Sequence, residues 1–313
     1  MGIAHWDDVE PNRIDKGPLG FTRYDLGEAA GTQSVGVTRA RVEPGKQSSP
    51  VHVEAGEEEI FFVLGGSGLS WQDGQVYDVG AGDCIVHRVA EEAHTLIAGS
   101  DGLDVLAFGE RAEAPFSYLP RAGVVRMGVT LEVPQGPHPF DREAAAGDLD
   151  LPEPSERPAT IVNVDSVEPD YEGPRGRWVT LARKAGSLRS GLNWGRLEPG
   201  HSGAAPHCHS ADEEIFVVLE GSGILELWPS PAHEQREKEV HPIRAGDVIS
   251  RPPSTAMSHY LTGGESRLTF LVYGTRRPND VCYYPRSNKI YWRGLGLIAR
   301  LEPLDYDDGE PED

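Results

Sequence analysis

Cysteine is scarce in this sequence, with only Cys84, Cys208 and Cys282 among 313 residues. The three are odd in number and form no CxxC pair, which is typical of free thiols in a reducing compartment. No run approaches the roughly 18 apolar residues that a membrane-spanning helix needs. The N-terminus also lacks the basic and apolar regions of a secretory signal. We therefore expect a cytoplasmic protein.

Positive charge is scarce as well. The chain has 29 lysines and arginines against 50 aspartates and glutamates, which leaves a formal net charge of −21. Such an acidic surface repels phosphate backbones and anionic lipids. Nucleic acids and membrane surfaces are therefore poor candidates for partners, and we expect a small-molecule substrate instead.

Helical patterning is nearly absent, with 141–147 as the one candidate segment. Instead, 37 glycines and 25 prolines divide the chain into short segments. The runs at 60–64 and 215–219 are apolar, β-branched and aromatic on both faces, which is typical of strands buried on both sides. Asp73-Gly74 between two apolar runs is a hairpin signal. The sequence therefore predicts an all-β fold.

Internal repetition is the most informative feature of the chain. The segment 58–64 matches 213–219, and 3–11 matches 161–169. Two copies of one fold are therefore predicted. The expected division is an N-terminal barrel at 1–133, a Pro-rich acidic linker at 134–158, a C-terminal barrel with an aromatic final segment at 159–303, and a disordered acidic tail at 304–313.

The second copy carries a cluster of metal-binding side-chain types. His207 and His209 are two residues apart, so on a strand both would point to the same face. Cys208 between them would face the other way, as a packed thiol. Glu214 and His259 complete a set of three imidazoles and one carboxylate. Such a set suits one divalent transition metal, Fe, Mn, Ni, Cu or Zn, and ligand type alone does not choose among them.

At these residues the sequence resembles a known superfamily. The spacing is similar to the two metal-binding motifs of the cupins, which here comprise Gly200, His207, His209, Glu214 and Gly221, then Gly246, Asp247, Pro253 and His259. The resemblance covers both copies. It implies a bicupin with two double-stranded β-helix (jelly-roll) barrels in tandem, and it implies that the three histidines and the glutamate are metal ligands. It implies no single reaction, because cupins include dioxygenases, decarboxylases, isomerases and non-catalytic binding proteins.

The first copy departs from this motif at one position. His52, Glu59 and His94 match ligands of the second copy, but Glu54 stands in place of the second histidine. Two imidazoles and two carboxylates could still hold a divalent cation, with one more negative charge and harder ligands. The alternative is a lapsed site in a structural barrel, so a second metal in this half stays an open expectation.

The expected function is a metal-dependent enzyme acting on a small molecule in the C-terminal barrel. The resemblance favours dioxygenase-like oxidoreductase chemistry, with a redox-neutral isomerase or decarboxylase and a non-catalytic binder as alternatives. Glu214 could act as a base and Arg251 could receive an anionic substrate. The expected cavity lining is Phe216, Val218 and Leu261. Fused barrels already supply a twofold contact, so a monomer and a homodimer are both expected to be viable.

Overall fold

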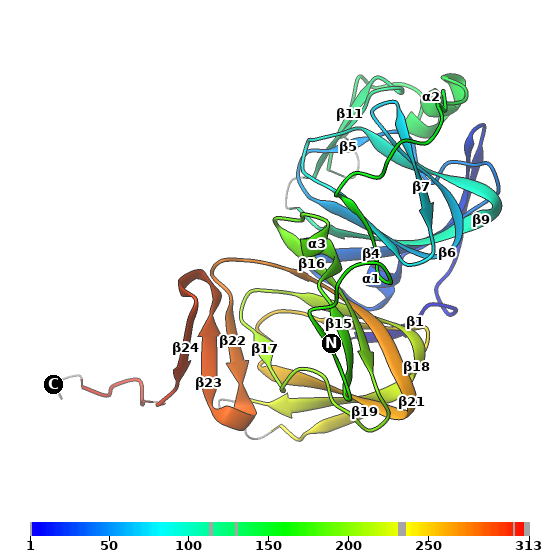
Figure 1. Ribbon diagram of the computed structural model, residues 1–313. Coiled ribbons are helices and arrows are strands. Elements are labelled where there is room, and N and C mark those ends of the chain that lie inside the picture. Colours follow the sequence, from blue (N-terminus) through cyan, green and yellow to red (C-terminus); the bar gives the residue numbers. More distant parts are fainter. Residues whose placement is uncertain (1, 113–114, 129–130, 231–235, 303, 310–313) are drawn as a thin grey trace.

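The chain forms two β units that lie side by side (Figure 1). The computed structural model describes residues 2–112, 115–128, 131–230, 236–302 and 304–309. Each unit contains an eight-stranded sheet and a four-stranded sheet. The predicted all-β fold of two tandem jelly-roll barrels is confirmed.

The larger sheet of the N-terminal barrel ends at one edge in a strand from beyond the linker. Its order is β13 (Ile161–Asn163), β8 (Asp83–His87), β6 (Glu59–Gln72), β9 (His94–Glu110), β4 (Val35–Val42), β3 (Leu19–Tyr24) and β2 (Asn12–Lys16), with β7 (Gln75–Gly80) paired to β6. The smaller sheet has the order β12 (Leu131–Val133), β11 (Val124–Met127), β10 (Phe116–Leu119) and β5 (Val53–Glu54).

The C-terminal barrel repeats this arrangement. Its larger sheet has the order β1 (Gly2–His5), β20 (Asp247–Arg251), β18 (Glu214–Pro229), β21 (Met257–Thr275), β16 (Ser190–Leu197), β15 (Gly176–Val179) and β14 (Tyr171–Gly173), with β19 (Glu239–Arg244) paired to β18. The smaller sheet has the order β17 (Cys208–His209), β22 (Val281–Tyr284), β23 (Lys289–Trp292) and β24 (Leu297–Arg300). The helical segments are α1 (Leu26–Ala29), α2 (Pro139–Ala145), α3 (Leu181–Lys184), η2 (Pro285–Ser287) and η3 (Arg293–Leu295).

Each larger sheet is completed by a strand from the other half of the chain. β1 pairs antiparallel with β20, and β13 pairs antiparallel with β8. The pairing differs from the predicted division into barrels at 1–133 and 159–303, because β1 joins the C-terminal sheet and β13 the N-terminal sheet. The repeat identified these two segments as equivalent. Equivalence alone does not reveal which of two identical folds a strand completes.

The two barrels share an apolar core. Ile60 and Phe62 of β6 belong to a cluster that spans both barrels, whereas Phe61 packs inside its own barrel. β18 repeats this alternation, so both strands are buried on both faces, as their apolar runs predict. Phe108 and Tyr273 stack across the interface with ring centroids 5.3 Å apart. Each barrel also has an interior core of its own.

Two buried glutamates connect the barrels at the edge of this shared core. Glu58, directly before β6, accepts hydrogen bonds from three main-chain N–H groups and two hydroxyls of residues 187–190, at 2.7 to 3.4 Å. Glu213, directly before β18, accepts hydrogen bonds from main-chain N–H groups of 33–35. Side chains two residues apart on an extended chain point to the same face. Because Ile60 faces the other barrel, Glu58 faces it as well.

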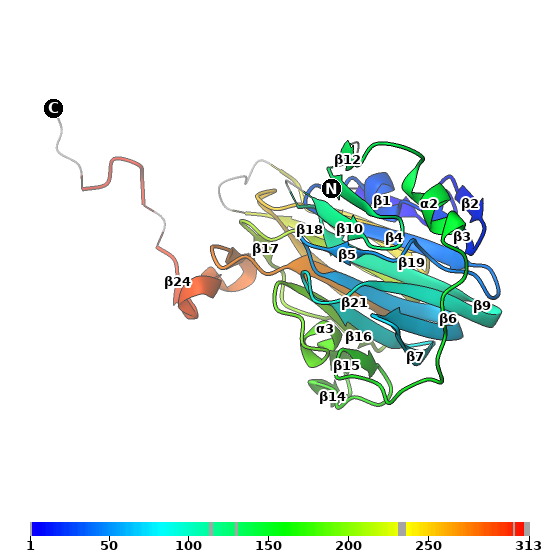
Figure 2. The same ribbon diagram turned by 90° about the horizontal axis from the view of Figure 1, so that it is seen from above.

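The predicted linker at 134–158 lies along the N-terminal barrel. Within it α2 overlaps the helix candidate at 141–147, and the fully buried Glu143 of α2 lies 3.1 Å from Arg121. Of the tail predicted to be disordered, 310–313 lie outside the described residues and 304–309 contain neither helix nor strand. Figures 1 and 2 both show β24 projecting away from the barrels. No helix in the described part of the chain is long and apolar enough to cross a membrane.

Candidate metal centre

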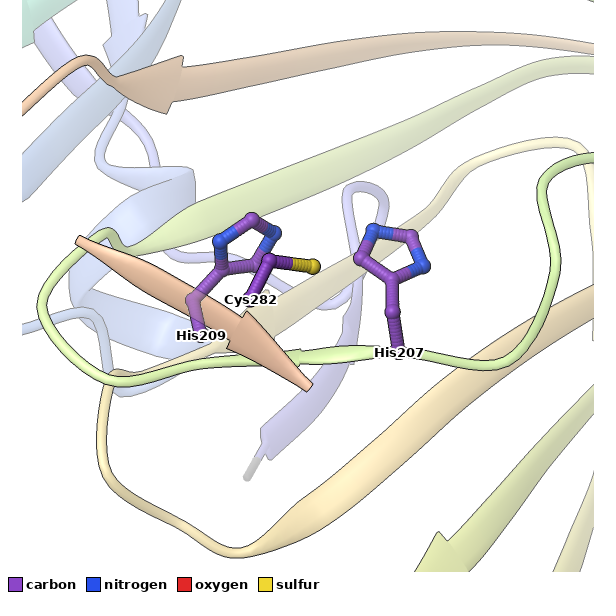
Figure 3. A group of neighbouring side chains, drawn as sticks. All are labelled: His207, His209 and Cys282. Carbon is purple, nitrogen blue, oxygen red and sulfur yellow. The ribbon is translucent and has the colours of Figure 1, made fainter. Parts of the chain in front are cut away.

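Two imidazoles lie on one face of the chain at β17, as their spacing predicts (Figure 3). His207 Nδ1 lies 2.8 Å from the carbonyl oxygen of Ala205, and His209 Nδ1 lies 2.8 Å from Asp280 Oδ2. A neutral histidine whose Nδ1–H donates to such an acceptor has Nε2 unprotonated, which is the form that binds metals. The local hydrogen bonds therefore orient both Nε2 atoms as ligands.

The other two predicted ligands meet these imidazoles inside the C-terminal barrel. Glu214 begins β18 and faces the barrel interior, and its Oε2 lies 3.1 Å from His259 Nε2 and 3.4 Å from His209 Nε2. The ligand atoms of His207, Glu214 and His259 all lie within 4.8 Å of one another. The structure therefore brings His207, Glu214 and His259 into one group, which His209 adjoins through its contact with Glu214.

The closest atoms of this cluster are buried and have only one another as polar partners. Glu214 Oε2 is in ion-pair contact with His209 Nε2 and His259 Nε2, and none of the three atoms makes a well-aligned hydrogen bond to any other group among the described residues. Buried polar atoms that are incompletely hydrogen-bonded are costly, so their convergence leaves room for one partner that can bind all of them. A divalent cation is such a partner, and the nitrogen and oxygen donors fit a transition metal.

The electrostatics of the cluster follow from its burial and its mixed charges. Burial opposes ionisation of Glu214, but His209 and His259 outweigh it and hold the pKa of Glu214 well below its ordinary value. Burial, with His207 nearby, lowers the pKa of His259 to about 3, so this imidazole is neutral. Burial would also lower the pKa of His209, but Glu214 and Asp280 raise it to about 11. A cation that binds here must displace the His209 proton, so binding weakens as the pH falls.

Asp280 contacts the cluster, and the sequence analysis did not identify it. Besides contacting His209, its carboxylate accepts hydrogen bonds from the main-chain N–H groups of Ala211 and Asp212 at 3.0 and 3.2 Å. It therefore orients the ring of His209 and fixes the turn before β18. No signal could have found it, because the internal repeat puts Pro115 at the matching position.

The N-terminal barrel contains a related but different cluster. His52 Nε2 and His94 Nε2 lie 3.2 and 2.9 Å from Glu59 Oε2 in hydrogen-bond contact, and the ligand atoms of all three lie within 4.8 Å of one another. Glu54 lies further out, with its Oε1 3.8 Å from His52 Nε2. Burial raises the pKa of Glu54 to about 7. Three of the four predicted residues therefore form a candidate metal triad, with the fourth beside it.

A cavity lies next to each cluster. The C-terminal cavity has a volume of about 130 Å³, and Phe216 and Leu261 line it as predicted, together with Trp178 and Phe270. Val218 belongs to the interior core and is not among the residues that line this cavity. The N-terminal cavity is larger, about 270 Å³, and its lining includes Arg23, Glu54 and Arg126.

Arg251 lies behind the C-terminal cluster and is not among the residues that line its 130 Å³ cavity. It is 4 % exposed, and its Nη2 donates a hydrogen bond to the main-chain oxygen of Met257. It also lies opposite Glu214 in the β18–β20 pairing. This placement stabilises the turn before β21, and the contact with an anionic substrate stays a prediction.

Comparison with known families agrees with this geometry. The family model described as "Cupin domain" matches residues 38–107, and the model described as "Cupin" matches residues 163–290. The protein is a bicupin. Each half of the bicupin supplies one matched region, and each matched region contains a His/Glu triad with its ligand atoms within 4.8 Å.

Solved structures with the same fold include oxalate decarboxylases. The Mn(II)-containing enzyme of Bacillus subtilis is 18 % identical to the bicupin with a TM-score of 0.61, over 90 % of this chain and 79 % of that one. The enzyme of Lactobacillus farciminis is 17 % identical with a TM-score of 0.62, over 90 % and 88 %. A vicilin-like seed storage protein of Arabidopsis thaliana is 30 % identical over 127 residues, which cover 38 % of this chain and 24 % of the relative. At these identities the solved structures establish the fold alone.

Proposed function

We propose that this bicupin is a metal-dependent enzyme that acts on a small molecule in its C-terminal barrel. The supporting observation is the convergence of three buried ligand-type atoms, His209 Nε2, Glu214 Oε2 and His259 Nε2, whose polar contacts among the described residues are only with one another, beside an apolar cavity. A purely structural cluster would more often complete the hydrogen bonds of such buried atoms with further groups.

His207, His209, Glu214 and His259 would hold the cation, which when bound would supply Lewis-acid chemistry and a template for substrate oxygens. The lowered pKa of Glu214 keeps this carboxylate ionised, as a metal ligand must be, and Glu214 could also act as the base of the reaction. Phe216 and Leu261 form an apolar wall that excludes water from the reacting groups.

The size of the cavity limits the substrate. A volume of about 130 Å³ is well below the roughly 300–1,000 Å³ of pockets that hold drug-sized ligands. We infer a substrate smaller than a drug-sized ligand, bearing oxygens that can approach the cation.

We propose dioxygenase-like chemistry as the reaction, on the resemblance of the four-ligand set. A redox-neutral reaction, such as decarboxylation, is the second candidate. It is supported by the fold shared with the oxalate decarboxylases over 90 % of this chain. Oxygen consumption separates the two. The proposal further includes a cytoplasmic location, a monomer or homodimer, and no nucleic-acid or membrane partner.

The test begins with elemental analysis of protein purified without added metal, followed by a panel of small carboxylates and vicinal diols or diketones with and without O2. We expect bound transition metal and turnover of at least one compound. Iron with substrate-dependent O2 uptake supports the dioxygenase, and manganese with O2-independent turnover or CO2 release supports the redox-neutral alternative.

His259→Ala and His94→Ala are a matched pair, because they remove equivalent side chains from the two barrels. If the C-terminal barrel is the active one, His259→Ala should abolish turnover and His94→Ala should retain it. Loss of turnover only in His94→Ala would contradict the proposal, as would a protein that binds ligands equally well after metal removal.

A further inference from the structure

A thiol lies beside the C-terminal metal cluster. In the β17–β22 pair, Cys282 stands directly opposite His209. Cross-strand partners in an antiparallel pair project to the same face, so Cys282 points the same way as the two imidazoles. Its Sγ and the ligand nitrogens of His207 and His209 lie within 4.8 Å of one another (Figure 3). Cys282 thus adds a sulfur to a site of nitrogens and an oxygen.

This thiol is placed differently from the other two cysteines. Cys282 is 2 % exposed and its sulfur contacts the Tyr284 hydroxyl on the same face of β22. Cys84 is buried in the apolar cluster between the barrels. Cys208 alternates with its histidine neighbours on the chain and belongs to none of the candidate metal-binding groups among the described residues. Only Cys282 therefore combines burial with proximity to two metal-binding nitrogens.

The equivalent position in the N-terminal barrel supports a role in metal selection. There β5 pairs with β10, and Ser117 stands opposite Glu54. The two barrels therefore differ at both members of one cross-strand pair, with two oxygen side chains in the N-terminal barrel and an imidazole and a thiol in the C-terminal barrel. Oxygen ligands suit Mg(II), Ca(II) and Mn(II), whereas thiolate and imidazole select softer cations such as Zn(II), Co(II) or Cu(I).

We propose that Cys282 is a thiolate ligand that, with His207 and His209, makes the C-terminal centre selective for a thiophilic cation, while the N-terminal centre takes a harder one. The group shares His207 with the His207–Glu214–His259 triad. On binding, the S–H bond breaks, a metal–sulfur bond forms and the proton leaves to solvent, with no change of oxidation state. The inference rests on the proposed metal site but not on any particular reaction.

The test uses Co(II) as a spectroscopic probe of the metal-free full-length protein, in a His52→Ala background that removes one ligand of the N-terminal triad. A cobalt–thiolate bond gives a near-ultraviolet charge-transfer band that nitrogen and oxygen ligands alone do not. We expect this band on stoichiometric Co(II) addition. Cys282→Ser should abolish the band. It should also weaken Zn(II) binding by at least roughly tenfold, because removing even a residue that only hydrogen-bonds to a metal ligand lowers affinity by about that much. Mn(II) binding should change little.

Cys208→Ser is the matched control, since it removes the neighbouring thiol and should leave the band unchanged. Cys282→Ala repeats the test with a side chain that brings no oxygen to the site. Near-ultraviolet circular dichroism of each variant without metal checks that the barrel is folded. Persistence of the band in the folded Cys282 variants, or its loss in Cys208→Ser, would overturn the inference.

The outcome also separates this inference from the proposed function. If Co(II) binds without a thiolate band, and His259→Ala abolishes this binding, the proposed metal site is supported and the role of Cys282 is refuted. Absence of any Co(II) binding in the His52→Ala background would refute both.

Discussion

Glu58 offers a direct test of how the two barrels are held together. Its side chain is 1 % exposed, and it accepts hydrogen bonds from Ser187 Oγ at 2.7 Å and from three main-chain N–H groups of 188–190 at 2.8 to 3.2 Å. Glu58→Ala removes the acceptor of the three main-chain N–H groups, whereas Ser187 Oγ keeps its hydrogen bond to the carbonyl oxygen of Ser190. The loop belongs to one barrel and the carboxylate to the other, so the substitution weakens the contact between them.

The magnitude follows from the number of hydrogen bonds and the exposure of the loop. A hydrogen bond to a charged group contributes roughly 1.5–3 kcal/mol, so four independent ones would sum to about 6–12 kcal/mol. Neighbouring contacts are not additive, and Leu188 is 75 % exposed, so water can reach part of the loop. We expect Glu58→Ala to lower the free energy of unfolding by about 3–5 kcal/mol and Tm by roughly 6–10 °C.

The pH dependence tests the same reasoning. Burial opposes ionisation of Glu58, but the hydrogen bonds from Leu188, Ser187 and their neighbours outweigh it and lower its pKa. A carboxyl with a lowered folded-state pKa stabilises the fold fully above its unfolded pKa of about 4.3, and loses that contribution as the pH falls through the folded value. The stability difference between wild type and Glu58→Gln should therefore be constant near neutrality and shrink below about pH 4.

Urea and thermal unfolding followed by tryptophan fluorescence measure the effect. Glu153→Ala, at an exposed position of the linker, is the control and should change the free energy of unfolding by less than about 0.5 kcal/mol. Glu58→Gln keeps one carbonyl acceptor and should cost about 1–2 kcal/mol. A Glu58→Ala protein as stable as the control would refute the idea that this carboxylate connects the barrels.

Three further outcomes are expected. Glu213→Ala should destabilise the protein about as much as Glu58→Ala, because it removes the equivalent carboxylate from 33–35; unfolding curves that differ greatly would count against equivalence of the two contacts. His259→Ala should strip metal from the C-terminal barrel, as elemental analysis would show by reduced stoichiometry, and unchanged stoichiometry would contradict the ligand assignment. Deletion of 1–6 removes β1 from the edge of β20, so it should destabilise the C-terminal rather than the N-terminal barrel; hydrogen exchange of β20 and β8 would tell them apart, and greater loss of protection in β8 would contradict the strand pairing.

Local patterns of the sequence predicted most of what depends on local geometry. The apolar runs at 60–64 and 215–219 predicted strands buried on both faces, and the alternation of side chains explains why Glu59 and Glu214 point into the barrels. The spacing of His207 and His209 predicted a shared face, which the structure has.

Features that depend on long-range pairing were not predictable in the same way. Asp280 and Cys282 reach the cluster only because β22 pairs with β17, across about 70 residues of chain. Arg251 lies within the second metal-binding motif, between Asp247 and Pro253, and this position predicts its strand. It does not predict the direction of the long side chain, whose guanidinium donates a hydrogen bond to the main-chain oxygen of Met257. The exchange of β1 and β13 depends on the arrangement of two barrels, which a repeat does not encode.

Because of that exchange, the two barrels of the bicupin cannot be separated at the linker without damage to both sheets. The first half would lack β13 and would carry β1 without the sheet that β1 pairs with. The second half would lack β1 and would carry β13 without its sheet. Each fragment would expose an unpaired edge at β8 or β20, which invites aggregation. Two fragments produced together could each satisfy the other's open edge. Within one molecule, the fused chain therefore makes the reciprocal strand exchange that a strand-swapped pair makes between two molecules.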